Sequence, residues 1–105
     1  MPFATEYERA IHFAKHGHEF GDPTEIDYER RADEFMTGPR NLTTRECVRR
    51  NGTDRLRLNI ANLHFGVAVV AKPIVVTHHI VPQGKIRRRG GIISYFKYEC
   101  TRTDV

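Results

Sequence analysis

The spacing of apolar residues changes near Arg45, and this change constrains the fold more than any other feature of the chain. Before Arg45, apolar residues recur at helical spacing in two segments. After it, runs rich in β-branched and aromatic residues follow one another, separated by turn residues. We therefore expect an α+β fold, in which two N-terminal helices pack on one face of an antiparallel sheet of about four to five strands.

The first helix is predicted from Thr5 to His16. Thr5 followed by Glu8 is a capping-box pattern, in which the two side chains satisfy free amides of the first turn. Gly17 is well placed to end the helix in a left-handed conformation. The apolar residues of this segment at helical spacing predict its buried face; they are Tyr7, Ala10, Ile11 and Ala14.

The second helix is predicted from the segment Asp22-Pro23-Thr24-Glu25 to about Met36. Asp22 would be its acidic cap, and Pro23 suits a first turn because that position needs no amide hydrogen. Gly38-Pro39 then ends the helix. The residues that we expect to be buried are Tyr28, Ala32, Phe35 and Met36.

The remaining chain predicts strands. Asn51-Gly52 is a typical hairpin turn, and it separates two strand-like runs at residues 47–50 and 55–60. Further strands are expected at residues 64–70, 74–81 and 92–98, with turns or a mobile loop at residues 83–85 and 90–91.

Length and composition predict one globular domain spanning residues 1–105. Apolar residues make up 39% of the chain and charged residues 29%, which excludes collagen-like and coiled-coil chains. The longest apolar run, residues 65–71, is too short to span a membrane, and no cleavable export signal is visible. Cys47 and Cys100 are read as buried or half-buried thiols; the alternative is that they lie on neighbouring strands and form a disulfide.

Charge is distributed unevenly between the two parts of the chain. Residues 1–40 contain five lysines and arginines against nine acidic residues, whereas residues 41–105 contain twelve against four. The second part also holds the basic run Lys85-Ile86-Arg87-Arg88-Arg89. This asymmetry predicts a surface that binds a polyanion, although a solubilising surface would have the same composition.

Three histidines and a lysine occur within seven positions, from His12 to His18. On a helix, His12, Lys15 and His16 lie on one face, where they can transfer protons and stabilise an anion. The alternative is that they merely interact with the helix dipole. His78 and His79 are adjacent, so in a strand they point to opposite faces and cannot act as a pair. No histidine or cysteine spacing indicates a metal site.

The segment from Lys15 to Gly21 resembles the Lys-His-x-x-acidic-Phe-Gly element of colicin D-like tRNase domains. Related elements occur in toxin domains of contact-dependent inhibition systems, within the barnase, EndoU, colicin and RelE-like (BECR) group of ribonucleases. Residues 50–57, 65–67 and 91–97 are similar to the first hairpin, central strand and closing strand of that group. The chain departs from the family at Phe13, where a lysine is usual, and in the long segment of residues 72–90. Two alternatives follow: His12 replaces the missing lysine, or the long segment supplies part of the site.

This resemblance implies an endoribonuclease that needs no metal or other cofactor. It would cleave tRNA and leave 2′,3′-cyclic phosphate and 5′-hydroxyl ends. His16 would be the acid or base, Lys15 would stabilise the phosphate, Ser94 would donate a hydrogen bond to it, and His12 is the second imidazole candidate. The residues expected to contact RNA are Arg55 or Arg57, Arg87, Arg88, Arg89 and Phe96, the last by stacking on a base.

Such an activity also implies partners and a route. A tRNase poisons its own cell, so we expect a cognate immunity protein or antitoxin. The expected place of action is the cytoplasm, and the sequence leaves two alternatives open, a free protein or the C-terminal toxin part of a larger secreted protein. The alternative is a non-catalytic RNA- or protein-binding module with the same fold, and the oligomeric state stays open.

Overall fold

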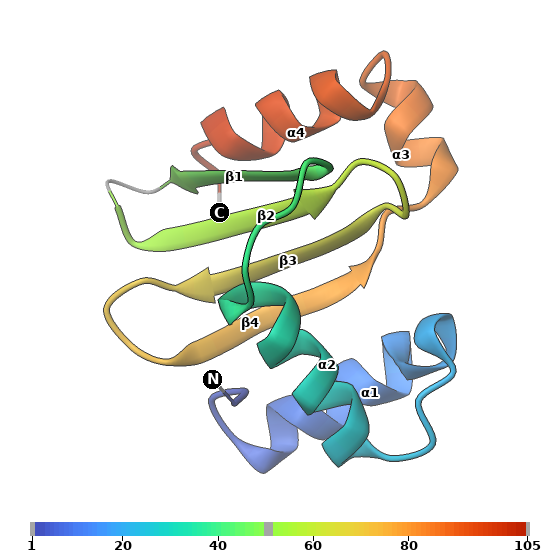
Figure 1. The fold of residues 1–105 in the computed structure, drawn as a ribbon, viewed down its shortest axis with the longest axis vertical. Coiled ribbons are helices and arrows are strands. Elements are labelled where there is room, and N and C mark those ends of the chain that lie inside the picture. Colours follow the sequence, from blue (N-terminus) through green and yellow to red (C-terminus); the bar gives the residue numbers. More distant parts are fainter. Residues whose placement is uncertain (1, 50–51, 105) are drawn as a thin grey trace.

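The computed structural model describes residues 2–49 and 52–104, and it has an α+β fold, as predicted. Four helices and four strands are present in this described part of the chain (Figure 1). Their order is α1 (Glu6–Phe20), α2 (Glu25–Thr37), β1 (Thr44–Arg49), β2 (Asp54–Asn59), β3 (His64–Val69), β4 (Ile74–Ile80), α3 (Gln83–Arg88) and α4 (Ile92–Thr101). None of the described helices is long and apolar enough to cross a membrane.

The four strands form one antiparallel sheet in the order β1-β2-β3-β4. The predicted hairpin joins β1 to β2; Arg50 and Asn51 of its turn lie outside the described residues, and Gly52 has a φ of +91°. A register shift interrupts the β3–β4 pairing between Val67 and Ala68. β4 is an edge strand, and its outer side faces α1 and the N-terminal segment, where Phe3 pairs with Val75.

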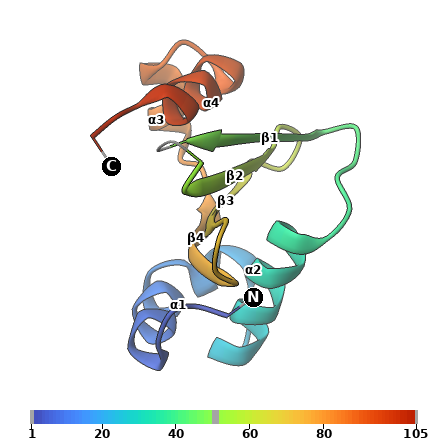
Figure 2. The ribbon, with the colours of Figure 1, turned by 90° about the vertical axis from the view of Figure 1, so that its left-hand side faces the viewer.

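Apolar residues fill both faces of the sheet, so both faces need a helical cover. On one face, Leu56 and Val67 pack with residues of α3 and α4 such as Tyr95. On the other, Ala68 packs with residues of α2 such as Tyr28 and Met36. Figures 1 and 2 show the two helical layers, α1 and α2 on one side and α3 and α4 on the other. The prediction that helices cover only one face is therefore wrong.

Helix α1 begins as predicted but continues one turn further. The Thr5 hydroxyl accepts a hydrogen bond from the Glu8 amide at 3.0 Å. Gly17 does not end the helix; it is buried inside it, close to the Phe13 ring, where a Cβ would lie only 2.5 Å from that ring. Gly21, with a φ of +70°, is the actual C-cap.

The predicted buried face of α1 is only partly right. Ala10 and Ile11 are half-buried, but Tyr7 is 72% exposed and Ala14 is exposed, whereas Phe13 and Phe20 pack against the core residues of α2 and the sheet. The capping pattern locates a helix start, but it does not determine which side of the helix meets the sheet. That side is selected by the larger aromatic side chains, which bury more apolar area.

Helix α2 follows the prediction closely. Its N-cap is Thr24, not Asp22, because the Asp22 carboxylate is held instead by the Arg31 guanidinium at 2.8–3.0 Å. Tyr28, Ala32 and Met36 are fully buried and Phe35 is partly buried. The helix approaches the sheet at Gly66, where an added Cβ would lie 2.6 Å from the Met36 sulfur.

The segment after β4 is helical, which corrects two predictions. Residues 83–88 form α3, not a turn or mobile loop, and residues 92–101 form α4, not a closing strand. The buried residues of α4, Tyr95, Phe96 and Glu99, recur at helical spacing and cover the sheet, so packing overrides the β-propensity of the segment. Gly90 and Gly91, both with positive φ, separate the two helices.

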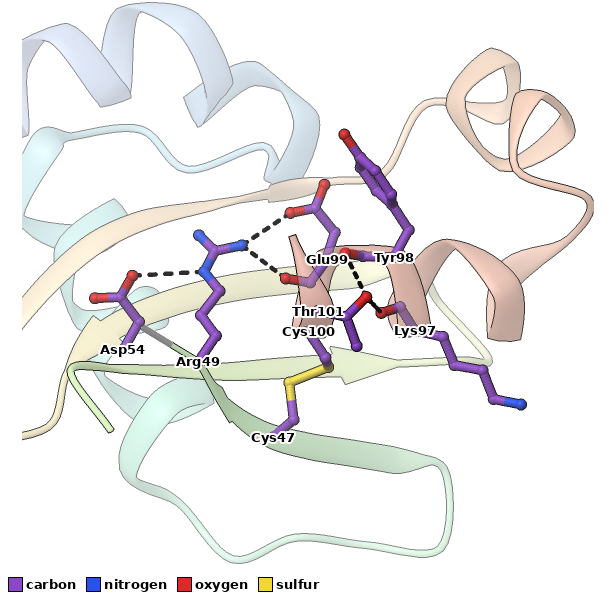
Figure 3. Close-up of a disulfide and its surroundings, with 8 residues drawn as sticks. All are labelled: Cys47, Arg49, Asp54, Lys97, Tyr98, Glu99, Cys100 and Thr101. Atoms are coloured by element: carbon purple, nitrogen blue, oxygen red, sulfur yellow. Dashed lines mark hydrogen bonds and ion pairs between the residues drawn. A yellow bond between two sulfur atoms is a disulfide. The ribbon is translucent and has the colours of Figure 1, made fainter. Parts of the chain in front are cut away.

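A disulfide joins β1 to α4, so the reading of free thiols is wrong. Cys47 and Cys100 are bonded, although Cys100 lies on a helix and not on a neighbouring strand (Figure 3). Beside it, Arg49 donates hydrogen bonds to the Glu99 carboxylate and backbone carbonyl, both at 3.0 Å. Arg49 also contacts the Asp54 carboxylate at 3.5 Å. Helix α4 is therefore fixed to β1 by a covalent and an ionic link.

Removing the disulfide should lower the free energy of unfolding by roughly 2–4 kcal/mol, because the bond restricts the unfolded chain. The sequence separation of 53 residues places it among the longer loops. Urea denaturation with and without a reductant measures the change. The Cys47→Ser, Cys100→Ser double variant is the control and should not respond to reductant. Equal urea midpoints for the oxidised and reduced parent would contradict the prediction.

His78 lies fully buried in the core between the sheet and the first two helices. Its ring stacks on the Phe20 ring with the ring centroids 4.5 Å apart, and its centroid lies 4.9 Å from that of the Phe35 ring. Among the described residues, neither ring nitrogen has a hydrogen-bond partner. Burial and nearby positive charge, first that of His64, lower the pKa of His78 to about 3. The native state therefore keeps this imidazole neutral.

The pH dependence of stability should reflect this burial. The pKa of His78 is about 3 in the folded state and 6.5 in an unfolded chain, so the unfolded state binds one more proton between these values. Stability is therefore greatest above pH 6.5 and falls as the pH drops towards 3. As the pH falls through this window, the free energy of unfolding of the His78→Leu variant should decrease by about 1.4 kcal/mol less per pH unit than that of the parent. Urea melts from pH 4 to 8 test this, and parallel profiles would refute it.

Candidate functional site

Three histidine rings form a row along the seam between α1 and the edge strand β4. The ring centroids of His12 and His16 are 6.3 Å apart, and those of His16 and His79 are 5.1 Å apart. Phe3 closes the row with its ring 5.1 Å from that of His12. The side chains of His12 and His16 are 19% and 23% exposed, so this histidine row is accessible but held in place.

Glu19 fixes His16 to the edge of the sheet. One carboxylate oxygen lies 2.5 Å from His16 Nδ1, and the other accepts a hydrogen bond from the Ile80 amide at 2.7 Å. Burial alone would raise the pKa of Glu19, but these two hydrogen bonds hold it below its usual value. The carboxylate is therefore ionised at neutral pH. Whenever the His16 ring is neutral, Glu19 therefore places its proton on Nδ1, and among the described residues no group forms a hydrogen bond with Nε2.

His79 contributes an imidazole that is neutral at pH 7. Burial, the charge of His16 and the Lys85 ammonium lower its pKa to about 4. Its Nδ1 lies 3.4 Å from the Thr77 hydroxyl. Its ring lies 5.4 Å from that of Phe65, on the opposite face from His78. The prediction that His78 and His79 point to opposite faces is thus confirmed.

The other predicted residues of this helix face have different environments. Burial and the charge of His16 lower the pKa of His12, and Glu8 opposes this with a carboxylate oxygen 3.8 Å from Nε2. Lys15 is exposed, and its positive charge also acts on His12. The structure therefore brings His12 and His16 together, with Lys15 at the rim of the row.

Arg55 and Arg57 differ in how available they are. Arg57 is buried, and its guanidinium binds the carbonyls of Phe35 and Gly38 at the end of α2 at 3.1 and 2.6 Å. It also donates to Glu46 at 2.9 Å, so its hydrogen bonds stabilise the fold. The side chain of Arg55 is 38% exposed and lies 3.5 Å from the same carboxylate.

The remaining predicted residues lie on α3 and α4, which cover the sheet face opposite α2. Ser94 is exposed on α4, and Phe96 is buried in the core beneath that helix. Arg87, Arg88 and Arg89 are exposed on and just after α3. The structure therefore does not bring Ser94 or Phe96 to the histidine row.

Sequence reasoning did not name Glu19 as a site residue, and it considered His79 and Lys85 only as members of the long segment of residues 72–90, offered as an alternative source of site residues. Glu19 stands three residues after His16, and a helix places such a pair in contact, so this signal was present. His79 and Lys85 are more than sixty residues away from His16, and only the tertiary fold joins them. Within residues 2–49 and 52–104, no three His, Cys, Asp or Glu side chains are grouped to hold a metal ion.

No protein-family model matches this chain, and no curated protein is similar enough to count as a match. The resemblance to colicin D-like domains stays a prediction.

Changing Glu19 to Gln should move a proton on His16. In Glu19→Gln the amide oxygen can still accept the Ile80 hydrogen bond, which leaves the amide nitrogen facing His16 Nδ1. Nδ1 must then accept, so the neutral ring carries its proton on Nε2. Nitrogen-15 NMR of the imidazole rings at pH 8 distinguishes the two tautomers. An unchanged His16 spectrum would mean that Glu19 does not determine the tautomer.

Proposed function

We propose that this protein is a metal-independent endoribonuclease of the colicin D-like kind. The observation that carries the proposal is the Glu19–His16 pair, stacked against neutral His79 and flanked by lysine charge. A carboxylate that orients an imidazole and leaves its second nitrogen free is the arrangement of a general base. Lys15 and Lys85 supply positive charge nearby.

The row provides the groups that RNA cleavage needs. His16 Nε2 takes the proton of the 2′-hydroxyl, and the 2′-oxygen then attacks the adjacent phosphorus. The bond from phosphorus to the 5′-oxygen breaks, and the protonated form of His12, a stronger acid because the pKa of His12 is lowered, donates the proton that this leaving oxygen requires. Lys15 and Lys85 stabilise the additional negative charge on the phosphoryl oxygens, commonly the largest contribution to catalysis. The products are a 2′,3′-cyclic phosphate and a 5′-hydroxyl.

We propose tRNA as the substrate class, on the resemblance of the segment from Lys15 to Gly21. The excess of positive charge in residues 41–105 supports a polyanionic substrate. The same charge suits an acidic immunity protein or antitoxin, which would block the basic surface by complementarity.

The disulfide supports delivery from outside the target cell. Disulfides form in oxidising compartments and are rare in a reducing cytosol. Formation of the Cys47–Cys100 bond therefore fits a chain that is exported as the C-terminal toxin part of a larger protein and then acts on cytoplasmic RNA.

A non-catalytic RNA-binding module is the second candidate. The exposed arginines of α3 favour it, because within the described residues none of them contacts a histidine of the row. Such a module would bind RNA through these arginines and would leave it intact.

The His16→Ala variant tests the proposal. Purified protein, with a chelator present, is incubated with total bacterial tRNA, and the RNA is separated on a denaturing gel. The parent should produce discrete fragments with cyclic phosphate ends. His16→Ala should cleave about 10²–10⁴ times more slowly, which is the usual contribution of general acid–base catalysis.

His18→Ala is the matched control, because His18 is an exposed histidine on the same helix. It should cleave at the parental rate. RNA binding by His16→Ala, measured by filter retention, should stay within about twofold of the parent. Intact RNA with the parent, together with binding, would replace the nuclease proposal by the binding module.

A further inference from the structure

A hollow with a volume of about 140 Å³ lies between α3 and α4. Four basic side chains line it, those of Lys85, Arg88, Arg89 and Arg102. We call this hollow the α3–α4 pocket. It contains none of the histidines of the row and shares with the row only Lys85, whose charge also acts on His79. The proposed catalytic site does not use the three arginines of the pocket.

Most of this charge is not neutralised within the described residues. Lys85 and Arg88 form no ion pair with any described carboxylate. The Arg89 guanidinium lies over the Tyr98 ring, 3.5 Å from its centroid, and this contact leaves its charge uncompensated. Like charges gathered around a concave surface repel one another and attract an anion.

The acidic residue that lines the pocket, Glu99, is already occupied. Its carboxylate accepts a hydrogen bond from Arg49 at 3.0 Å, and Arg102 lies 3.3 Å from its other oxygen (Figure 3 shows the Arg49 contact). Asp104 further holds Arg102 at 2.7 Å. Burial and Glu99 raise the pKa of Tyr95 to about 12, so its hydroxyl stays uncharged and does not repel an anion.

The elements that carry these groups are fixed. The Cys47–Cys100 bond and Arg49 attach α4 to β1. The Ile86 side chain belongs to the core, and its carbonyl accepts a hydrogen bond from the Gly91 amide at 3.0 Å. The basic side chains therefore extend from a rigid frame, which lowers the entropic cost of binding.

The dimensions of the pocket select the ligand. Sites for drug-sized molecules are usually larger than about 300 Å³, so this pocket is suited to a single compact group. Guanidinium forks match the oxygens of phosphate and bind them in pairs. We propose that the α3–α4 pocket binds a phosphate group. Its source is a phosphate of an RNA strand, which rests on the proposed function, or else a free phosphate ion.

Arg88→Gln tests the pocket, and Lys97→Gln is the control. Both residues are exposed and basic and belong to the layer of α3 and α4, but only Arg88 lines the pocket. Calorimetric titration at one fixed salt concentration uses two probes, inorganic phosphate and a short 2′-O-methyl RNA that lacks the attacking hydroxyl. For the bound probe, Arg88→Gln should raise Kd about tenfold or more, and Lys97→Gln should change it less than twofold. Thermal melting confirms that both variants are folded.

The outcomes separate the two sources. If Arg88→Gln weakens both probes and phosphate displaces the RNA, the pocket holds a phosphate of the strand. If Arg88→Gln weakens the binding of inorganic phosphate alone, the pocket binds a free phosphate ion. An equal loss of affinity in both variants, or no binding of either probe to the parent, would overturn the proposal that the pocket binds phosphate. Failure of tRNA cleavage would overturn the proposed nuclease and leave these binding results unchanged, so the two failures are distinguishable.

Discussion

The architecture follows from one constraint, that β3 has apolar side chains on both of its faces. Val67 and Ala68 are neighbours in this strand, they point to opposite sides, and both are buried. A sheet of this kind is stable only between two layers, because apolar area left in water on either side costs free energy. The first two helices supply one layer, and α3 and α4 supply the other. The disulfide and the Arg49 contacts then hold the second layer in place.

Local chemistry in the sequence was enough to predict much of the fold. The Thr5 cap, the buried face of α2 and the first four strands each depend on patterns within a few residues. The errors lie where tertiary packing decides. Residues 92–98 are rich in β-prone side chains, but their apolar positions follow a helical period, and the second face of the sheet required a helix. Two cysteines 53 residues apart contain no local signal of pairing.

In the candidate site, too, the sequence predicts what depends on local spacing and misses what depends on tertiary packing. The density of histidines singled out His16, and helical spacing correctly placed His12 beside it. The sequence could not show that this face lies against the outer edge of β4. There Glu19 accepts the Ile80 amide hydrogen, which an edge strand would otherwise leave unpaired, and the same contact orients His16. A single carboxylate thus satisfies the backbone and organises the imidazoles. Arg57 was predicted to contact RNA, but its guanidinium donates hydrogen bonds to carbonyls at the end of α2 and so stabilises the fold.

The disulfide divides the chain into a covalent ring and a free arm. Residues 47–100 form the ring, which contains three complete strands, α3 and the frame of the α3–α4 pocket. The arm contains α1 and α2, whose attachment to the ring involves no cross-link. His79 belongs to the ring, whereas His12, His16 and Glu19 belong to the arm. The disulfide therefore constrains only one half of the histidine row, and the other half is held against β4 by non-covalent contacts such as the Glu19–Ile80 hydrogen bond.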